Sequence, residues 1–216
     1  MSDLAIQAKY TKKPVYDFIK RAVDIMVSLV ALILLSPILA VVALLIKCSD
    51  GGNVIYRSPR IGKNGKEIAV FKFRSMKMNA DKLEDMLTEE ELEQYRKEYK
   101  LDNDKRVTRI GRIIRKTSID ELPQLFNVLI GNMSLVGPRP VLQEETELYG
   151  EYRDVLLSVK PGITGLWQAG GRNKITYADG GRQRTELKYV TERSLWLDIK
   201  IIFMTVGAVL KMDGAQ

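Results

Sequence analysis

Two adjacent carboxylates, Asp120 and Glu121, are the strongest candidates for chemistry in this sequence. The chain has 216 residues, no histidine and one cysteine, Cys48. Without histidine there is no imidazole base and no His-liganded metal site, and Cys48 has no imidazole to activate it. A carboxylate can itself attack phosphorus and become an aspartyl phosphate. Aspartate is therefore the obvious covalent nucleophile of this chain.

Cationic residues flank the carboxylate pair on both sides. Six lysines and arginines lie between 105 and 116, and Arg139 follows in a proline-locked Gly-Pro-Arg-Pro loop. Arginine forks match phosphate oxygens, and Mg²⁺ prefers one or two carboxylates together with substrate phosphates. The pattern therefore predicts a site where Asp120 and Glu121 hold Mg²⁺ beside a phosphate or pyrophosphate.

The same carboxylates also fit a purely structural role. Pro123 has no N–H and is tolerated in a first helical turn, so we expect a helix from about Ser118 to Gly131. Ser118 and Glu121 have the spacing of a capping box. The cationic surroundings favour binding, and capping stays open as the alternative.

A second acidic pattern, Asp102-Asn103-Asp104, has the D-x-D form with which many nucleotide-sugar glycosyltransferases hold a metal. Three residues make a weak pattern, and this chain has little room for the large α/β domain of those enzymes. We expect a loop here. A metal-dependent glycosyltransferase using Asp102 and Asp104 remains the first alternative function.

The elements before this site indicate a membrane anchor. Residues 25–46 contain no charge, and these 22 residues are long enough to cross a hydrocarbon core of ~30 Å. Pro37 interrupts the backbone hydrogen bonds, while the Ser36 hydroxyl can satisfy a freed carbonyl. Both flanks are basic, so the positive-inside rule favours entry and return on one face. We expect a re-entrant helix broken at Ser36-Pro37; a straight span and a buried core helix are the alternatives.

The remaining sequence divides into a soluble core and a terminal helix. Short strands are expected at 54–57 and 66–73 around a Lys63-Asn64-Gly65 turn, and an acidic helix at 81–100. Residues 194–211 predict an amphipathic interfacial helix or an ordinary packed one. The expected domains are 1–48 (basic segment and membrane helix), 49–193 (catalytic core) and 194–216. A net charge of +7 suits an anionic partner.

Several ordered motifs resemble the bacterial sugar transferase family, the monotopic phosphoglycosyl transferases. The resemblance covers about residues 18–213. Its motifs are KFRSM (72–76), RKTSIDELPQLFNV (115–128), GNMSLVGPRP (131–140), KPGITGLWQ (160–168), GRN (171–173) and SLWLDIK (194–200).

This resemblance implies a small, mainly helical α/β cytosolic core with a short β-hairpin, a re-entrant helix and interfacial helices at the bacterial inner membrane. It implies Mg²⁺-dependent transfer of a sugar-1-phosphate, with a hexose favoured, from a UDP-sugar to polyprenyl (undecaprenyl) phosphate. The reaction passes through a covalent phospho-sugar intermediate on the enzyme, and UMP is released. The polyprenyl-linked sugar that results initiates surface glycan synthesis. Expected partners are both substrates, the lipid bilayer and a second copy in a homodimer, with no nucleic acid.

The family's site residues map onto matching positions of this sequence. The resemblance implies that Asp120 is the nucleophile and that Glu121 completes the dyad. It also implies that Arg115 and Arg139 hold phosphates, and that Lys72 and Arg74 line the site. Glu186 stands in a shortened segment, 176–190, where many relatives carry an aspartate.

A second alternative is a non-enzymatic membrane-surface protein whose basic run, 105–116, binds anionic lipid or nucleic acid. We also expect no signal peptide and no N-terminal domain with several spans, which longer relatives carry.

Overall fold

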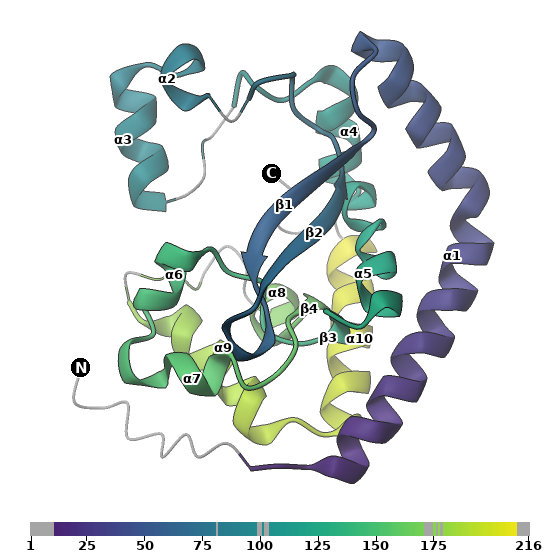
Figure 1. Ribbon diagram of the computed structural model, residues 1–216, viewed down its shortest axis with the longest axis vertical. Coiled ribbons are helices and arrows are strands. Elements are labelled where there is room, and N and C mark those ends of the chain that lie inside the picture. Colours follow the sequence, from purple (N-terminus) through teal and green to yellow (C-terminus); the bar gives the residue numbers. More distant parts are fainter. Residues whose placement is uncertain are drawn as a thin grey trace.

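The computed structural model describes residues 11–80, 82–98, 101, 104–170, 175, 177 and 179–210. Figure 1 shows one long helix, α1 (Pro14–Asp50), running along the side of a body built from the later elements. The body is mainly helical, with a two-stranded antiparallel sheet and a two-stranded parallel sheet. The expected mainly helical α/β fold with one long apolar helix is confirmed.

The remaining elements follow α1 in chain order. The strands are β1 (Ile55–Ile61), β2 (Glu67–Phe73), β3 (Ser134–Val136) and β4 (Gly162–Thr164). The short 3₁₀ turns are η1 (Lys63–Gly65), η2 (Ile119–Glu121) and η3 (Gly150–Tyr152). The helices are α2 (Leu83–Met86), α3 (Glu89–Glu98), α4 (Arg109–Lys116), α5 (Gln124–Ile130), α6 (Gln143–Glu147), α7 (Arg153–Leu156), α8 (Leu166–Gly170), α9 (Gly181–Glu192) and α10 (Leu195–Leu210).

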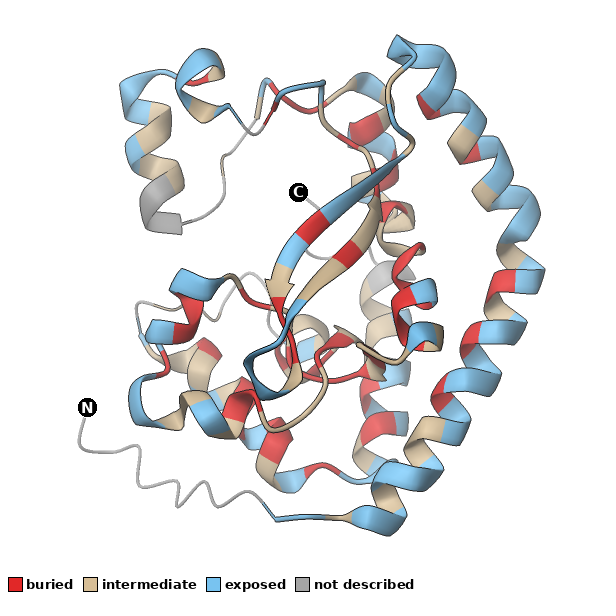
Figure 2. Ribbon diagram, in the orientation of Figure 1, coloured by how far each residue is buried: buried red, intermediate tan, exposed pale blue. Residues whose placement is uncertain are grey.

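One face of α1 packs on the body, while the rest of its apolar surface is exposed (Figure 2). Buried positions recur every three or four residues or at multiples of that spacing, as one face of a helix requires. They are Asp24, Ser28, Leu32, Val42 and Ile46. By length and composition α1 is long and apolar enough to cross a membrane. The helix ends at Gly51, whose left-handed backbone (φ 71°) suits glycine.

The expected break at Ser36-Pro37 is wrong, because α1 continues through both residues without interruption. Pro37 has no N–H to give the carbonyl of Ile33, four residues earlier. The Ser36 hydroxyl donates to that same carbonyl oxygen at 2.8 Å. The side chain thus replaces the backbone donor that proline removes, which explains why a helix survives here.

The predicted β-hairpin is confirmed. Strands β1 and β2 pair antiparallel from Ile55 opposite Phe73 to Ile61 opposite Glu67. The turn between them places Asn64 and Gly65 in the left-handed region, at φ 59° and 74°. Asparagine and glycine tolerate this region best, so the local sequence alone specifies the hairpin.

The acidic helix expected at 81–100 is divided into α2 and α3, with Leu87 in extended backbone between them. Thr88 explains the restart. Its hydroxyl accepts from the Glu91 N–H at 3.3 Å, and the Glu91 carboxylate accepts from the Thr88 N–H at 3.0 Å. This reciprocal capping box begins a new helix.

The parallel strands β3 and β4 bring the Gly-Pro-Arg-Pro loop against the Pro161-Gly162 turn. A Cβ atom on Gly162 would lie 2.1 Å from the backbone nitrogen of Gly137, so only glycine permits this approach. The Gly162 N–H donates to the carbonyl of Pro138 at 2.8 Å. The loop that carries Arg139 is therefore firmly held.

Candidate active site

The carboxylate pair lies in η2, a single turn between α4 and α5. Ser118 precedes the turn in the left-handed region, at φ 56°, and its side chain makes no capping hydrogen bond. The capping-box alternative is therefore wrong for Ser118. A non-glycine residue at positive φ is uncommon, and such residues concentrate at functional sites.

Asp120 and Glu121 sit in different surroundings. Asp120 is buried, with 8% of its surface exposed. Glu121 is part-exposed and pairs with Lys72 of β2, whose Nζ lies 2.9 Å from Oε1. The hairpin thus delivers a cation directly to the turn, as the KFRSM motif implies.

Arg115 comes from the last turn of α4 and lies close enough to Asp120 for the two charges to interact. Its Nε donates to the Ser75 hydroxyl at 2.8 Å, which fixes the guanidinium just after β2. Burial lowers the pKa of Arg115, and the negative charge of Asp120 opposes that shift. Asp120, Glu121, Lys72 and Arg115 therefore form one cluster.

The position of α4 depends on Gly111. A Cβ atom there would lie 1.9 Å from the backbone oxygen of Ser75, so only glycine lets the helix pack this closely. Thr108 begins α4 by accepting from the Gly111 N–H at 2.8 Å. Close packing and a capped start together bring Arg115 to the carboxylates. Ser75 was not among the predicted site residues, although it lies within the KFRSM motif.

Arg74 has different partners. Its guanidinium pairs with both carboxylate oxygens of Asp50 at the end of α1, and its Nε donates to the Asn53 carbonyl at 2.6 Å. This bidentate pair raises the pKa of Arg74. In this structure Arg74 anchors the end of α1 to the end of β2.

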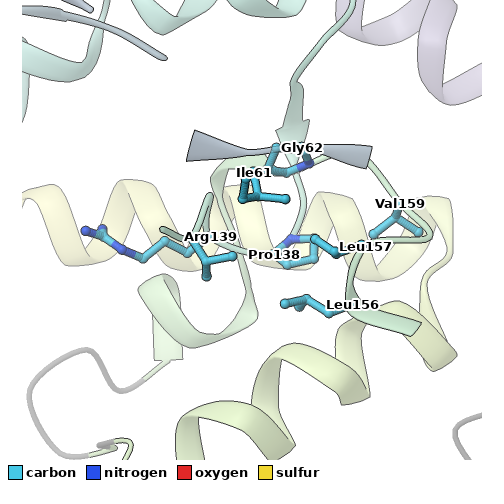
Figure 3. Close-up of a pocket in the computed structure, with 9 residues that line it drawn as sticks. Ile61, Gly62, Pro138, Arg139, Leu156, Leu157 and Val159 are labelled. Carbon is cyan, nitrogen blue, oxygen red and sulfur yellow. The ribbon is translucent and has the colours of Figure 1, made fainter. Parts of the chain in front are cut away.

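Arg139 belongs to a second charged cluster. Its backbone N–H donates to Glu186 at 3.2 Å, and its guanidinium lies 5.9 Å from the ring centre of Trp167. Figure 3 shows its side chain extending away from the small apolar pocket that Pro138, Leu156 and Val159 help to line.

Three charged residues near Arg139 are buried: Arg182, Glu145 and Glu186. Arg182 lies between the rings of Trp167 and Tyr177, at 4.2 and 4.0 Å, and forms an ion pair with Glu145 at 3.4 Å. Burial raises the pKa of Glu186 to about 7, against the opposing effects of Arg182 and Arg139. Sequence analysis singled out Glu186 but missed Arg182, because its neighbours come from α6, α8 and α9.

Asp104, the described aspartate of the D-x-D pattern, gives no support to the alternative function in which Asp102 and Asp104 hold a metal. Asp104 is bound to the buried Arg106, with Oδ2 2.7 Å from Nη2, while Asp102 and the GRN motif at 171–173 lie outside the described residues. Within the described ranges, no three Asp, Glu or Cys side chains gather to hold a metal by themselves. The adjacent carboxylates of Asp120 and Glu121 still fit a hard cation that takes its other ligands from substrate phosphates and water.

Comparison with known proteins gives consistent matches over almost the whole chain. A family model described as "Bacterial sugar transferase" matches residues 15–212. The chain is 50% identical to an "Uncharacterized sugar transferase" of Haemophilus influenzae, over 91% of this chain and 42% of that protein. It is 47% identical to the "Undecaprenyl-phosphate galactose phosphotransferase" of Salmonella typhimurium, over 92% of this chain and 42% of that protein.

A shorter relative is covered almost end to end. The chain is 43% identical to the "Exopolysaccharide production protein ExoY" of Rhizobium meliloti, over 94% of this chain and 90% of that protein. The chain thus spans less than half the length of the first two relatives and nine-tenths of the third.

Proposed function

The chain belongs to the bacterial sugar transferase family, and from that premise we propose that it transfers a sugar-1-phosphate from a UDP-sugar to polyprenyl phosphate, releasing UMP. The observation that carries the proposal is the cluster at η2: a buried Asp120 beside Glu121, with Lys72 paired to Glu121 and the charge of Arg115 close to Asp120. Phosphoryl transfer needs a positioned nucleophile and neutralised phosphate charge, and this cluster offers both.

In the first step, a carboxylate oxygen of Asp120 attacks the phosphorus that bears the sugar. The bond from that phosphorus to the oxygen bridging the two phosphates breaks, and UMP leaves with the bridging oxygen and its electron pair. In the second step, a phosphate oxygen of the polyprenyl phosphate attacks the same phosphorus. The Asp120–phosphorus bond breaks and the carboxylate is restored.

The surrounding residues hold charge in place. Lys72 keeps Glu121 oriented, and Arg115, fixed by Ser75, offers a planar donor for phosphate oxygens. Asp120 and Glu121 would hold Mg²⁺, which when bound supplies further neutralisation of phosphate charge. Arg139 and Arg74 remain predicted phosphate ligands. In the structure, Arg74 pairs with Asp50 and the backbone N–H of Arg139 donates to Glu186.

We place the enzyme on the cytoplasmic face of the bacterial inner membrane, entering one side of the bilayer without spanning it. Both halves of α1 pack on the same body, which supports this arrangement. Asp24 bonds to Ser134 and Leu135 at its start, whereas Val42 and Ile46 pack with Phe73 near its end. A straight span would carry one half across ~30 Å of hydrocarbon, away from these partners.

The division of labour follows from that placement. We propose the domain division expected from the sequence: 1–48 for the basic segment and membrane helix, 49–193 for the catalytic core and 194–216 for the interfacial segment, although α1 continues to Asp50. Trp196 and Phe203 of α10 are 76% and 74% exposed, as expected for side chains that face lipid. We propose a hexose as the sugar, which the galactose in the name of the Salmonella relative supports, with N-acetylated sugars as the alternative. The product initiates exopolysaccharide or capsule synthesis.

The test is intact-mass analysis of the full chain with a panel of UDP-sugars and Mg²⁺, followed by addition of polyprenyl phosphate. We expect a sugar-phosphate adduct and UMP, both lost in Asp120→Asn and kept in Asp85→Asn, a matched exposed aspartate. Release of UDP would instead favour the Asp102/Asp104 glycosyltransferase. Unchanged turnover in Asp120→Asn would contradict the nucleophile. A parent chain that reacts with no UDP-sugar, and whose binding to anionic lipid or nucleic acid is unchanged by Asp120→Asn, would favour the binding protein.

A further inference from the structure

A surface hollow of about 630 Å³ lies at the far end of the hairpin from η2. Three segments form it: the residues before α1, the turn between β1 and β2, and α7 with the residues that follow it. We call it the basic hollow; its polar lining includes Lys12, Lys63, Asn64, Gly65, Arg153 and Asp154.

The charge of the basic hollow is strongly positive. Lys12, Lys63 and Arg153 line it, against the single carboxylate of the exposed Asp154. Among the described residues, none of these three cations has a carboxylate within ion-pair distance. The Nε atom of Arg153 is buried and has no hydrogen-bond acceptor among those residues.

More positive charge lies next to the hollow. Burial lowers the pKa of Lys160, and the nearby charges of Arg21 and Lys63 lower it further, against the effect of Asp24. Mutual repulsion among these cations costs free energy, and a bound anion would offset that cost.

The walls of the basic hollow are held in place. The Asn64 N–H donates to the carbonyl of Leu157 at 2.7 Å, which fixes the hairpin turn on the end of α7. Gly65 faces open space, with nothing within 4 Å of the position of a Cβ atom. The hairpin turn that lines the hollow is therefore held against the end of α7, and the side next to Gly65 is open to solvent.

Its position relative to lipid comes from the start of α1. Lys12 stands two residues before the helix, and the first exposed apolar side chains, Val15 and Phe18, follow within two turns. The Nζ of Lys13 donates to the carbonyl of Arg193 at 2.8 Å, which places this segment beside the start of α10 and its exposed Trp196. Lysines and tryptophans together are typical of the membrane–water boundary.

We propose that the basic hollow binds the phosphate of an anionic phospholipid headgroup, at a site separate from the reacting carboxylates. Lys72 lies seven positions beyond Gly65, mostly along β2, a distance of roughly 23 Å. A free phosphate ion has the same chemistry, but the boundary position favours a headgroup that arrives from the bilayer. The headgroup fixes how the body sits on the membrane surface.

The test uses the full chain in neutral detergent, without sugar nucleotide, so its outcome is independent of the proposed reaction. Native mass spectrometry and calorimetry follow binding of dioctanoyl phosphatidylglycerol, dioctanoyl phosphatidylcholine and inorganic phosphate. We expect one phosphatidylglycerol per chain. We also expect Lys63→Ala/Arg153→Ala to weaken that binding by about tenfold or more, since two juxtaposed cations are removed.

The matched control is Lys66→Ala/Lys188→Ala, which removes the same charge from exposed sites outside the hollow. We expect its affinity to change by less than about threefold. Equal weakening in both double variants would overturn the proposal, because it would show a diffuse charge effect. Equal affinity for the two lipids, or for inorganic phosphate and phosphatidylglycerol, would also overturn it. Thermal unfolding of each variant identifies any loss that comes from misfolding.

Discussion

The carboxylate of Glu186 is buried where its negative charge is disfavoured. The residue is 1% exposed, and its carboxylate accepts from the backbone N–H of Arg139 while facing Arg182 and Glu145. Burial raises its pKa to about 7, so the folded chain binds this proton more tightly than the unfolded chain does. Stability from this group is therefore complete at low pH and is lost as pH rises from the usual carboxyl range through 7.

Glu186→Gln removes that pH dependence while keeping an oxygen to accept from Arg139. We expect the variant to match the parent chain near pH 5 and to be more stable by about 2 kcal/mol near pH 8. Thermal unfolding at the two pH values measures the difference. Glu147→Gln, at an exposed acid at the end of α6, is the control. We expect its stability relative to the parent chain to be the same at both pH values. A constant offset at both pH values would contradict the raised pKa.

The candidate site was partly predictable from single residues. Asp120, Glu121, Lys72 and Arg115 form one cluster, as the carboxylate pair and the motifs implied. The bond from Arg115 to Ser75 needed the close approach of Gly111, and sequence spacing does not reveal that approach. The pairing of Arg74 with Asp50 likewise depends on where a 37-residue helix ends in space.

At the scale of elements, α1 shows how one hydroxyl changes the effect of a proline. The sequence correctly indicated that Ser36 can satisfy a freed carbonyl, yet we expected a break. The hydrogen bond to Ile33 is local and short, so the chain stays helical through Pro37, while the axis of α1 bends along its length (Figure 1). By contrast, the hairpin was predictable because the Asn-Gly turn specifies both its strands and its register.

Ser36→Ala is expected to destabilise the chain by about 1 kcal/mol, because the Ile33 carbonyl then lacks a donor. In a Pro37→Ala background the backbone N–H returns and the same substitution should cost almost nothing. Unfolding in detergent of the parent chain, the two single variants and the double variant gives the coupling free energy between the two substitutions. Ser49→Ala serves as control, since its hydroxyl donates to Ile46 at 2.7 Å where no proline follows. Equal costs in both backgrounds would contradict the replacement of one donor by the other.

At the scale of the molecule, Asp198 of α10 joins the first and last helices that the structure describes. Its carboxylate accepts from Tyr16 and Lys20 of α1, both at 2.9 Å, and from Tyr189 of α9 at 2.8 Å. Sequence patterns identified both apolar helices but not this junction, because its members lie about 180 residues apart.

Among the described residues, Asp198→Ala leaves the part-buried Lys20 with one longer ion pair, to Asp24 at 3.9 Å. We expect a loss of about 3 kcal/mol in stability and faster proteolysis at the start of α1. Thermal unfolding and limited digestion measure the two effects. Asp17→Ala, an exposed acid on the same helix, should change neither. Normal protease resistance in Asp198→Ala would show that other contacts hold α1.

The junction also sets an order of events during synthesis. Tyr16 and Lys20 leave the ribosome first, and Asp198 is added about 180 residues later. At roughly 5–20 residues per second, the first helix waits on the order of 10–40 s for its last partner. Through that interval its apolar surface has no finished body to cover it. The bilayer is then its first folding partner, and the rest of the protein assembles onto a helix already placed in lipid.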